Sequence, residues 1–424
     1  MLKRLDHFYK FSIVAYIITI IYVLWYPAII SPDTTTYLQM QIYRSPGYPI
    51  FLRVFLKVFG DHYLFFIVLF QISFGLVAVQ VFLLQLKSIF KLKWWQLCVT
   101  LIILLVPFYP NLLVANNLCS EGLSYPLYLL LIGFSLKLFF ESNYRNLIYL
   151  SLSFILLCLT RGQFIVIPII LILVLVLQEK RAILKRKNII ILLTLITLPI
   201  LTNVADKTYH DFLHRNFVST PFSYTNIITQ AFFVSKKDDL TKIKNSDYKE
   251  IFQQVYKRND SLNFMAKNLQ GNWTEKYKVL HEKFPKICNA SIHETGFNHF
   301  YYSKNLSYAK SYINTEEACK NIFPIFVSNN LKAYSLVYLE NIFYGFKSKI
   351  IAFLFIIIAL WSFIKLLKSF QLDTAFIFMM SLLVISNALI VAIACHSIER
   401  YLFYNYFCLL IIPILLFRKK LITK

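Results

Sequence analysis

Apolar runs long enough to cross a lipid bilayer recur along most of this chain, and they constrain its fold more than any other feature. A helix that spans the hydrocarbon core needs roughly 20 mostly apolar residues, and helices satisfy their own backbone hydrogen bonds there. The runs cover residues 11–30, 63–84, 97–115, 122–140, 147–159, 164–177, 189–204, 350–367, 375–394 and 401–417. The sequence therefore predicts an all-α integral membrane protein with about ten transmembrane helices.

The charge composition fits the same class of protein. Only 15% of the residues are charged, against roughly 25% in an ordinary soluble domain. The formal net charge of +23 would suggest a nucleic-acid partner in a soluble protein. Here much of the excess lies in short loops between apolar runs, where it sets the orientation of the spans. The lipid bilayer is thus the expected partner, and the charge requires no nucleic acid.

Lysine and arginine are concentrated in alternate connections, which is the pattern that the positive-inside rule describes. These connections carry Lys87, Lys91, Lys93, Arg145, Lys180, Arg181, Lys185, Arg186, Lys187, Lys365 and Lys368. The basic N-terminus and the long run at 11–30 favour an uncleaved first span over a signal peptide. We therefore expect a multi-pass protein of the cell membrane, in a bacterium the inner membrane, with both termini in the cytoplasm.

Three regions follow from this topology: an N-terminal bundle over 1–204, a polar insert over 205–349 and C-terminal spans over 350–424. The first outer loop, 31–62, ends in an apolar stretch whose two cations, four residues apart, share one helical face. That stretch, 50–59, predicts a short amphipathic helix in the membrane interface, or else the start of the second span.

The insert over 205–349 is the long extracytoplasmic segment of the predicted topology. Stretches with helical potential at 247–258 and 262–269 predict a small, mainly helical domain. Cys288 and Cys319 both lie in it, and in an oxidising compartment they either form a disulfide or remain free thiols.

Ionisable residues gather near the outer ends of several predicted spans, where charge is costly unless it is paired or functional. They are Asp33, Arg44, Glu121, Arg161, His396, Glu399 and Arg400. Most have a structural alternative: Asp33 and Glu121 could cap helices, and Arg161 and Arg400 could extend to the interface. The alternative for His396 and Glu399, which the sequence favours over a role as ligands, is that they are solvated loop residues. Their recurrence on one side of separate spans favours a shared polar site.

Several short motifs, in order along the chain, carry a resemblance to a known family. They are Asp33 with Tyr37, then Arg44-Ser45-Pro46-Gly47-Tyr48-Pro49, Glu121, Leu159-Thr160-Arg161-Gly162 and Glu399-Arg400-Tyr401. In this order the chain resembles the polyprenyl-phosphate-sugar glycosyltransferases of the GT-C fold, which include the aminoarabinose transferases of lipid A and the protein O-mannosyltransferases. The motifs spread over most of the membrane part, whereas the insert matches nothing in that family.

The resemblance implies transfer of a sugar from a polyprenyl-phosphate donor to an extracytoplasmic glycan, lipid or protein. It implies Asp33 as the general base and Arg44, Arg161 and Arg400 as ligands of the donor phosphate. Further site candidates are Tyr37, Tyr48, Glu121, Glu399 and His396. Some family members use a divalent metal, but the sequence offers no complete set of ligands, so no cofactor is certain.

Two other functions are compatible with the sequence. A polysaccharide polymerase would also have many spans, a large outer loop and outer arginines, but it would add many sugars rather than one. A flippase or transporter of lipid-linked sugars would place ionisable groups near the membrane midplane and show internal repeats. The outer position of the charges favours a transferase.

Overall fold

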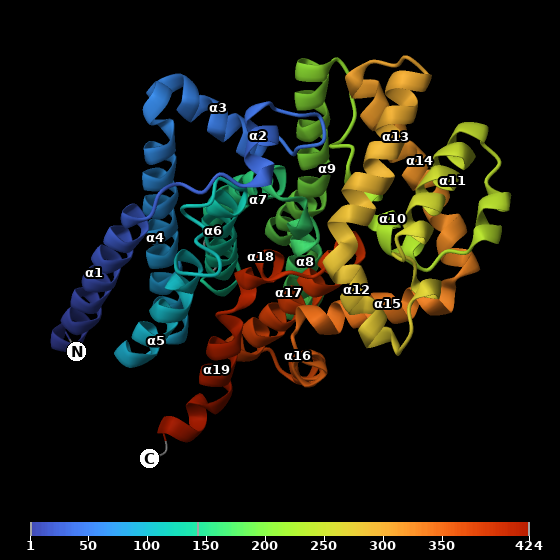
Figure 1. Ribbon diagram of the computed structural model, residues 1–424. Helices are drawn as coiled ribbons and strands as arrows, with labels where there is room; N and C mark the ends of the chain where they lie inside the picture. Colours follow the sequence, from blue (N-terminus) through green and yellow to red (C-terminus); the bar gives the residue numbers. More distant parts are fainter. Residues whose placement is uncertain (1, 142–143, 423–424) are drawn as a thin grey trace.

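The computed structural model describes residues 2–141 and 144–422, and the side chains of 7–141 and 144–417. Within these residues all regular secondary structure is helical, apart from one isolated bridge between Ile29 and Asn117. Figure 1 shows a bundle of long helices with a group of shorter helices beside it. The all-α prediction is confirmed.

Among the described residues, eight helical stretches are long and apolar enough to cross a membrane. They include α1 Leu2–Trp25, α4 Tyr63–Phe90, α6 Glu121–Phe140, α8 Ile167–Glu179, α9 Arg186–His214, α16 Lys349–Lys368, α17 Leu372–Ala394 and α19 Cys408–Ile422. The remaining two predicted spans correspond to the shorter apolar helices α5 Trp94–Leu105 and α7 Asn146–Thr160. α1 begins and α19 ends at the same end of the bundle (Figure 1).

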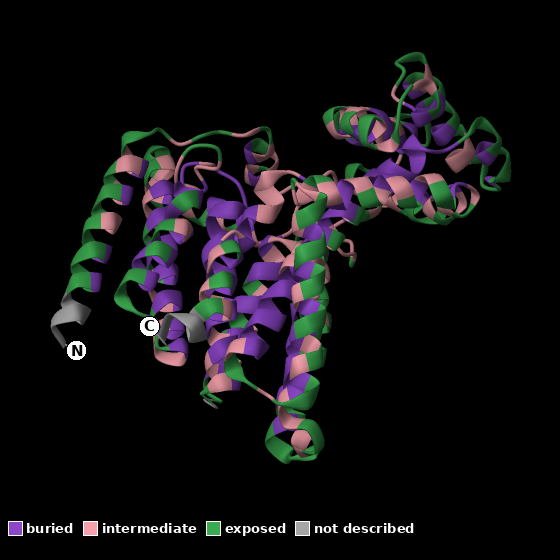
Figure 2. Ribbon diagram, turned by 90° about the horizontal axis from the view of Figure 1, so that it is seen from below, coloured by how far each residue is buried: buried purple, intermediate pink, exposed green. Residues whose placement is uncertain are grey.

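Helix α6 forms the centre of the bundle and is buried along most of its length (Figure 2). It packs against α4 and α7. Gly122 permits a close approach here, because an added Cβ atom would lie 2.0 Å from the side-chain oxygen of Gln71 on α4. The outer start of α6 is therefore fixed tightly against α4.

The first outer loop contains two helices, α2 Pro32–Leu38 and α3 Gly47–Phe59. α3 includes the predicted helix at 50–59, and Arg53 and Lys57 are exposed on it. A 3-10 turn, Gly60–His62, separates α3 from α4, and α3 turns away from the α4 axis (Figure 1). The stretch is thus a helix of its own rather than the first turns of the second span.

The insert begins later than predicted, because α9 continues to His214 rather than ending near residue 204. Its helices are α10 Ser223–Phe233, α11 Ser246–Ser261, α12 Trp273–Pro285, α13 Glu294–Asn298, α14 Tyr308–Asn329 and α15 Leu331–Gly345. They enclose a second hydrophobic core, separate from that of the bundle. The helix predicted over 262–269 is wrong, since Asn263 has a φ of 55° and only a 3-10 turn follows.

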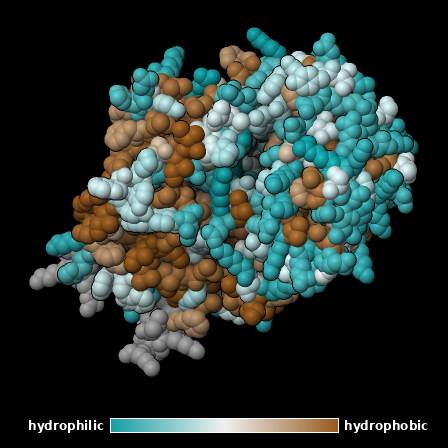
Figure 3. Space-filling view, viewed as in Figure 1, coloured by the Kyte–Doolittle hydropathy of each residue, from teal (hydrophilic) through white to brown (hydrophobic). Residues whose placement is uncertain are grey.

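The surface differs between the two parts. In Figure 3 hydrophobic residues dominate the surface of the bundle, whereas hydrophilic residues dominate that of the insert. Inside the insert, Cys288 and Cys319 are both buried free thiols that contact Thr225. The sequence left open whether these two cysteines form a disulfide or remain free thiols, and in the structure they are free thiols.

Candidate functional site

Five charged side chains from five separate segments meet at one end of the bundle. Arg44 lies 2.7 Å from Asp33, and Arg161 lies 2.7 Å from Glu121. Arg400 joins the two pairs, because it lies 3.2 Å from Asp33 and also contacts Glu121. We call these five residues the ionic cluster. The structure thus brings together five of the seven ionisable residues for which a shared polar site was predicted.

Helix ends place these side chains. Asp33 lies in the first turn of α2, where Pro32 starts the helix and a carboxylate is favoured by the helix dipole. Glu121 is the first residue of α6, and Arg161 directly follows α7. Arg400 lies in the short helix α18, Glu399–Leu402. Because α6 begins and the neighbouring α7 ends at this point, the bundle itself holds Glu121 beside Arg161.

The Asp33 side of the cluster is built almost entirely from the first outer loop. Arg44 Nε donates to Thr36 Oγ1 at 2.8 Å, and its guanidinium lies 4.7 Å from the centre of the Tyr37 ring. Burial raises the pKa of Asp33, but Arg44 and Arg400 outweigh burial and hold that pKa below its ordinary value. Asp33 is therefore ionised at neutral pH, as a proton acceptor must be, although the arginines reduce its basicity.

The Glu121 side of the cluster is buried more deeply. Arg161 Nε donates to Gln163 Oε1 at 2.8 Å, and its guanidinium lies 4.7 Å from the Tyr401 ring centre. Tyr404 also contacts Arg161, at 3.4 Å through its hydroxyl. The side chains of Arg161 and Glu121 are only 10% and 4% exposed. Buried charges of this kind persist only when they are paired and hydrogen-bonded, as they are here.

The charges of the cluster do not cancel. Three arginines carry +3 and two carboxylates carry −2, which leaves one positive charge. Because the side chains are partly or fully removed from water, that charge is screened less than it would be on a free surface. The site can therefore bind one further anion with a gain in electrostatic complementarity.

The other predicted site residues take different positions. Tyr37 lies under Arg44, within the site. Tyr48 is fully buried and donates to Gln71, so it supports the floor beneath Tyr37. Glu399 pairs with Lys347 instead of the arginines, and His396 packs on His281 and Phe284 of the insert. Glu399 thus lines the cavities beside the cluster, whereas His396 packs against the insert and lines neither of them.

The sequence analysis named Tyr401 within a motif but missed the other uncharged partners of the arginines. They are Thr36, Ser120, Gln163 and Tyr404. Each lies within eight residues of a predicted charged residue in the sequence, and that proximity is the only signal that could have indicated them. Polar and aromatic residues are too common in such positions for the signal to be specific.

The insert reaches the site through an aromatic cluster. Tyr43, next to Arg44, packs against Phe222, His293 and Tyr312, with ring centres 4.8–5.7 Å apart. Burial, together with Arg44, lowers the pKa of His293 to about 4, so its imidazole is neutral at neutral pH. The insert therefore braces the loop that carries Asp33 and Arg44.

Two cavities open beside the cluster. Cavity A, of about 240 Å³, is lined by Glu121, Glu399 and Arg400 together with Asn111 and Asn117. Cavity B, of about 660 Å³, lies between the insert and the C-terminal spans. Glu399 and Ile398 line both. Cavities A and B are therefore neighbours, with Ile398 and Glu399 between them.

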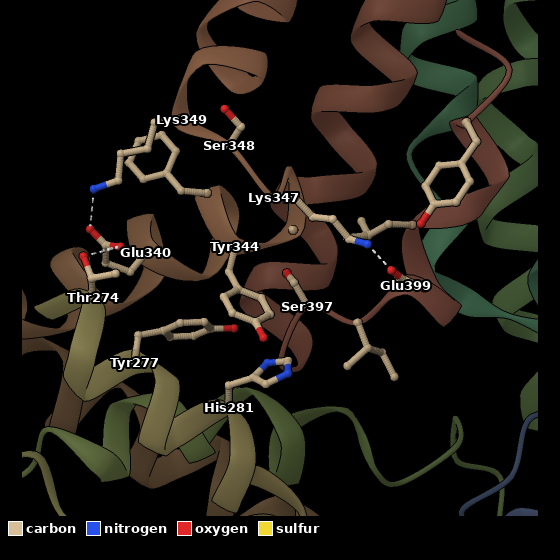
Figure 4. Close-up of a pocket in the computed structure, with 15 residues that line it drawn as sticks. Thr274, Tyr277, His281, Glu340, Tyr344, Lys347, Ser348, Lys349, Ser397 and Glu399 are labelled. Carbon is tan, nitrogen blue, oxygen red and sulfur yellow. Dashed lines mark hydrogen bonds and ion pairs between the residues drawn. The ribbon is translucent and has the colours of Figure 1, made fainter. Parts of the chain in front are cut away.

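Cavity B has a polar and aromatic wall. Figure 4 shows Tyr277 and His281 of α12 and Tyr344 of α15 between two ion pairs, Glu340 with Lys349 and Lys347 with Glu399. Rings together with charged and hydroxyl groups can bind a molecule that has apolar faces and many hydroxyls.

Metal binding gains no support from the described side chains. Among them, no three His, Cys, Asp or Glu residues lie close enough to hold an ion together. Both carboxylates of the cluster are already paired with arginines.

The fold alone defines the class of this chain: it is an all-α protein with helices long and apolar enough to cross a membrane. No family model, no curated protein and no solved structure matches the chain.

Proposed function

We propose that the chain is a membrane glycosyltransferase that moves a sugar from a polyprenyl-phosphate donor to an extracytoplasmic acceptor. The single observation that carries this proposal is the ionic cluster, with one uncompensated positive charge at the end of a membrane bundle. A phosphate attached to a membrane lipid is an anion at the headgroup level of the bilayer, which is where the end of a membrane bundle lies. The cluster therefore has the charge and the position that such a donor requires.

The transfer assigns a role to each part of the cluster. The acceptor hydroxyl attacks the anomeric carbon, its proton passes to the Asp33 carboxylate, and the bond from that carbon to the phosphate oxygen breaks. The departing electron pair remains on the phosphate, where Arg44, Arg161 and Arg400 stabilise the added negative charge. A single displacement of this kind inverts the anomeric carbon.

The acceptor would occupy cavity B. Its volume of about 660 Å³ and its aromatic wall suit one or a few sugar units, and Glu399 connects it to cavity A. The insert supplies α12 and α15 to this wall. The insert thus determines which glycan, lipid or protein is accepted.

A test of the proposal needs no knowledge of the sugar. Cells without the chain should accumulate one lipid-linked sugar and lose that sugar from an envelope glycan, lipid or protein, as measured by mass spectrometry of both fractions. Loss of a single residue supports transfer of one sugar, whereas loss of a whole polymer would indicate the polymerase alternative. Unchanged lipid-linked sugars and unchanged glycans would refute both.

A further inference from the structure

A further cavity lies wholly within the insert. Cavity C has a volume of about 370 Å³, which falls in the range of roughly 300–1,000 Å³ that small-molecule sites occupy. It shares no lining residue with cavity A or cavity B. Its wall comes from the segment after α10, the 3-10 turn Ala266–Asn268, the end of α14 and the first turns of α12 and α15.

Lysine side chains determine the charge of cavity C. Four lysines line it, and no acidic residue is among the described residues that do so. Lys267 pairs with Asp260 at 2.9 Å. Lys236 and Lys332 are exposed, and neither forms an ion pair with a described side chain. The cavity therefore has a positive potential that attracts an anion.

The start of α15 adds hydrogen-bond donors to the same wall. The first three residues of α15 line the cavity, and their amides precede the first hydrogen bond within the helix, which Tyr334 donates to Asn330. Asn330 forms no side-chain cap bond to them, since its side-chain amide donates to Asp239 instead. A helix start that is left uncapped in this way favours a negative charge.

Asn329 is an independent observation that points to an acceptor at this place. It lines the cavity, and Lys242 Nζ donates to its side-chain oxygen, which fixes the orientation of the amide. The side-chain nitrogen of Asn329 is buried and has no hydrogen-bond partner among the described residues. A buried donor without a partner costs free energy, and an acceptor bound at this edge of the cavity removes that cost.

An aromatic ring completes the wall. Trp273 is half-buried and is the one aromatic residue among the described residues that line cavity C. Lys276 Nζ lies 5.3 Å from its ring centre and donates to the carbonyl of Ala266 at 3.1 Å. A cation and an apolar ring thus lie together. A sugar ring offers an apolar face to such a ring, whereas an inorganic anion does not.

We infer that cavity C binds one anionic sugar unit, a sugar that carries a carboxylate or a phosphate. The acid group lies at the start of α15, and the sugar ring lies against Trp273. The ligand comes from the aqueous phase, because cavity C belongs to the insert, whose surface is hydrophilic (Figure 3). This site goes beyond the proposed function, and because no lining residue is shared, a failure of one leaves the other unaffected.

Direct binding tests the site without reference to transfer. The purified full chain is placed in phosphatidylcholine nanodiscs, and isothermal titration calorimetry measures the binding of glucuronate, glucose 6-phosphate, glucose and inorganic phosphate. We expect both acidic sugars to bind at least about tenfold more tightly than glucose, the low end for one charge-assisted hydrogen bond. Glucose 6-phosphate should also bind more tightly than inorganic phosphate. Equal affinity in either comparison would overturn the inference.

Nanodiscs that contain phosphatidylglycerol distinguish a free sugar from a lipid headgroup. At physiological ionic strength, where surface charge is screened within about 8 Å, both acidic sugars should bind nearly as tightly as in phosphatidylcholine nanodiscs. A loss of affinity of about tenfold or more, the size of effect expected from one charge-assisted hydrogen bond, would show that cavity C binds the headgroup and would overturn the inference.

Two variants locate the ligand. Lys332→Gln and Lys236→Gln change exposed lysines that line the cavity from different segments, so each variant should fold normally. Each should weaken binding of the acidic sugars by about tenfold, through the loss of one charge-assisted hydrogen bond. Lys278→Gln is the matched control, since Lys278 is exposed on α12 and does not line the cavity. Weaker binding by the two cavity variants alone would support the site, and equal binding by all three would overturn it.

Discussion

The two sides of the ionic cluster have the same parts but different surroundings. Each has a carboxylate 2.7 Å from an arginine, and each arginine lies 4.7 Å from a tyrosine ring centre. On the loop side, Asp33 and Arg44 are eleven residues apart and are 31% and 20% exposed. On the helix side, Glu121 and Arg161 come from two different helices and are 4% and 10% exposed.

The difference in exposure separates a chemical from a structural role. A partly exposed ion pair contributes less to stability than a buried one, so its members can more easily exchange partners with water or a substrate. Removing one member of a buried pair leaves an uncompensated charge and costs far more. We therefore assign the proton transfer to the loop side, and the positioning of Arg400 to the helix side.

The largest expected effect concerns Asp33. Asp33→Asn keeps the size of the side chain and removes its capacity to accept a proton, so sugar transfer should fall by about 10²–10⁴-fold. Protein abundance should remain normal, because the side chain is partly exposed. Transfer is measured with donor-loaded membranes. Asp61→Asn, in the same outer loop but outside the cluster, is the matched control; near wild-type transfer by the Asp33 variant would remove Asp33 from catalysis.

The second effect concerns the helix side. Glu121→Gln leaves Arg161 without its carboxylate in a buried position, which should cost about 3–5 kcal/mol of folding stability. The thermal midpoint in detergent should therefore fall much further for Glu121→Gln than for Asp33→Asn. If both variants lose the same stability, the distinction between the two sides is wrong.

Much of the fold follows from the sequence because apolar run length and backbone chemistry leave few alternatives in a membrane. The end of α9 was missed because the chain turns polar near residue 205 while its backbone continues as a helix to His214. The helix predicted at 262–269 failed because Asn263, a residue type that tolerates a positive φ, lies just past the end of α11 and stops the helical backbone there. Run length thus indicates where a span is required, but not where its helix ends.

The charged members of the site were predictable for the same reason, since charge at span ends requires partners. Their pairing was not, because Asp33 in α2 and Arg400 in α18 are 367 residues apart and meet only through the tertiary fold. The partner of Glu399 was likewise not predictable from the sequence. Its neighbour Arg400 enters the cluster, whereas Glu399 turns toward Lys347 and lines the cavities.

The third effect compares the two paired arginines. Arg44→Ala should reduce transfer by roughly 10–150-fold through the loss of one charge-assisted interaction, with little loss of protein. Arg161→Ala should instead reduce protein abundance, because it leaves Glu121 buried without this partner. Arg44→Lys should restore only part of the activity, since lysine cannot bind Thr36 and Asp33 in the same fork. Equal abundance of the two alanine variants would contradict this comparison.

The smallest effect concerns the pH dependence of the loop side. His293 packs on Tyr43, beside Arg44, and burial with that arginine lowers the pKa of His293 to about 4, below its ordinary value of 6.5. A depressed histidine pKa means that the unfolded state binds the proton first as pH falls. The contribution of His293 is therefore complete above pH 6.5 and declines between pH 6.5 and about 4.

We expect the thermal midpoint to fall on the order of 2–4 °C between roughly pH 7 and roughly pH 5 through this group. His293→Phe keeps a ring against Tyr43 and removes the titration, so its midpoint should change less over the same range. His62→Phe, an exposed histidine in the same outer loop, is the control and should behave as wild type does. If the midpoint of the His293 variant falls with pH as steeply as that of the wild type, another group causes the decline. His396 is one such group, because burial and His281 also lower its pKa to about 4.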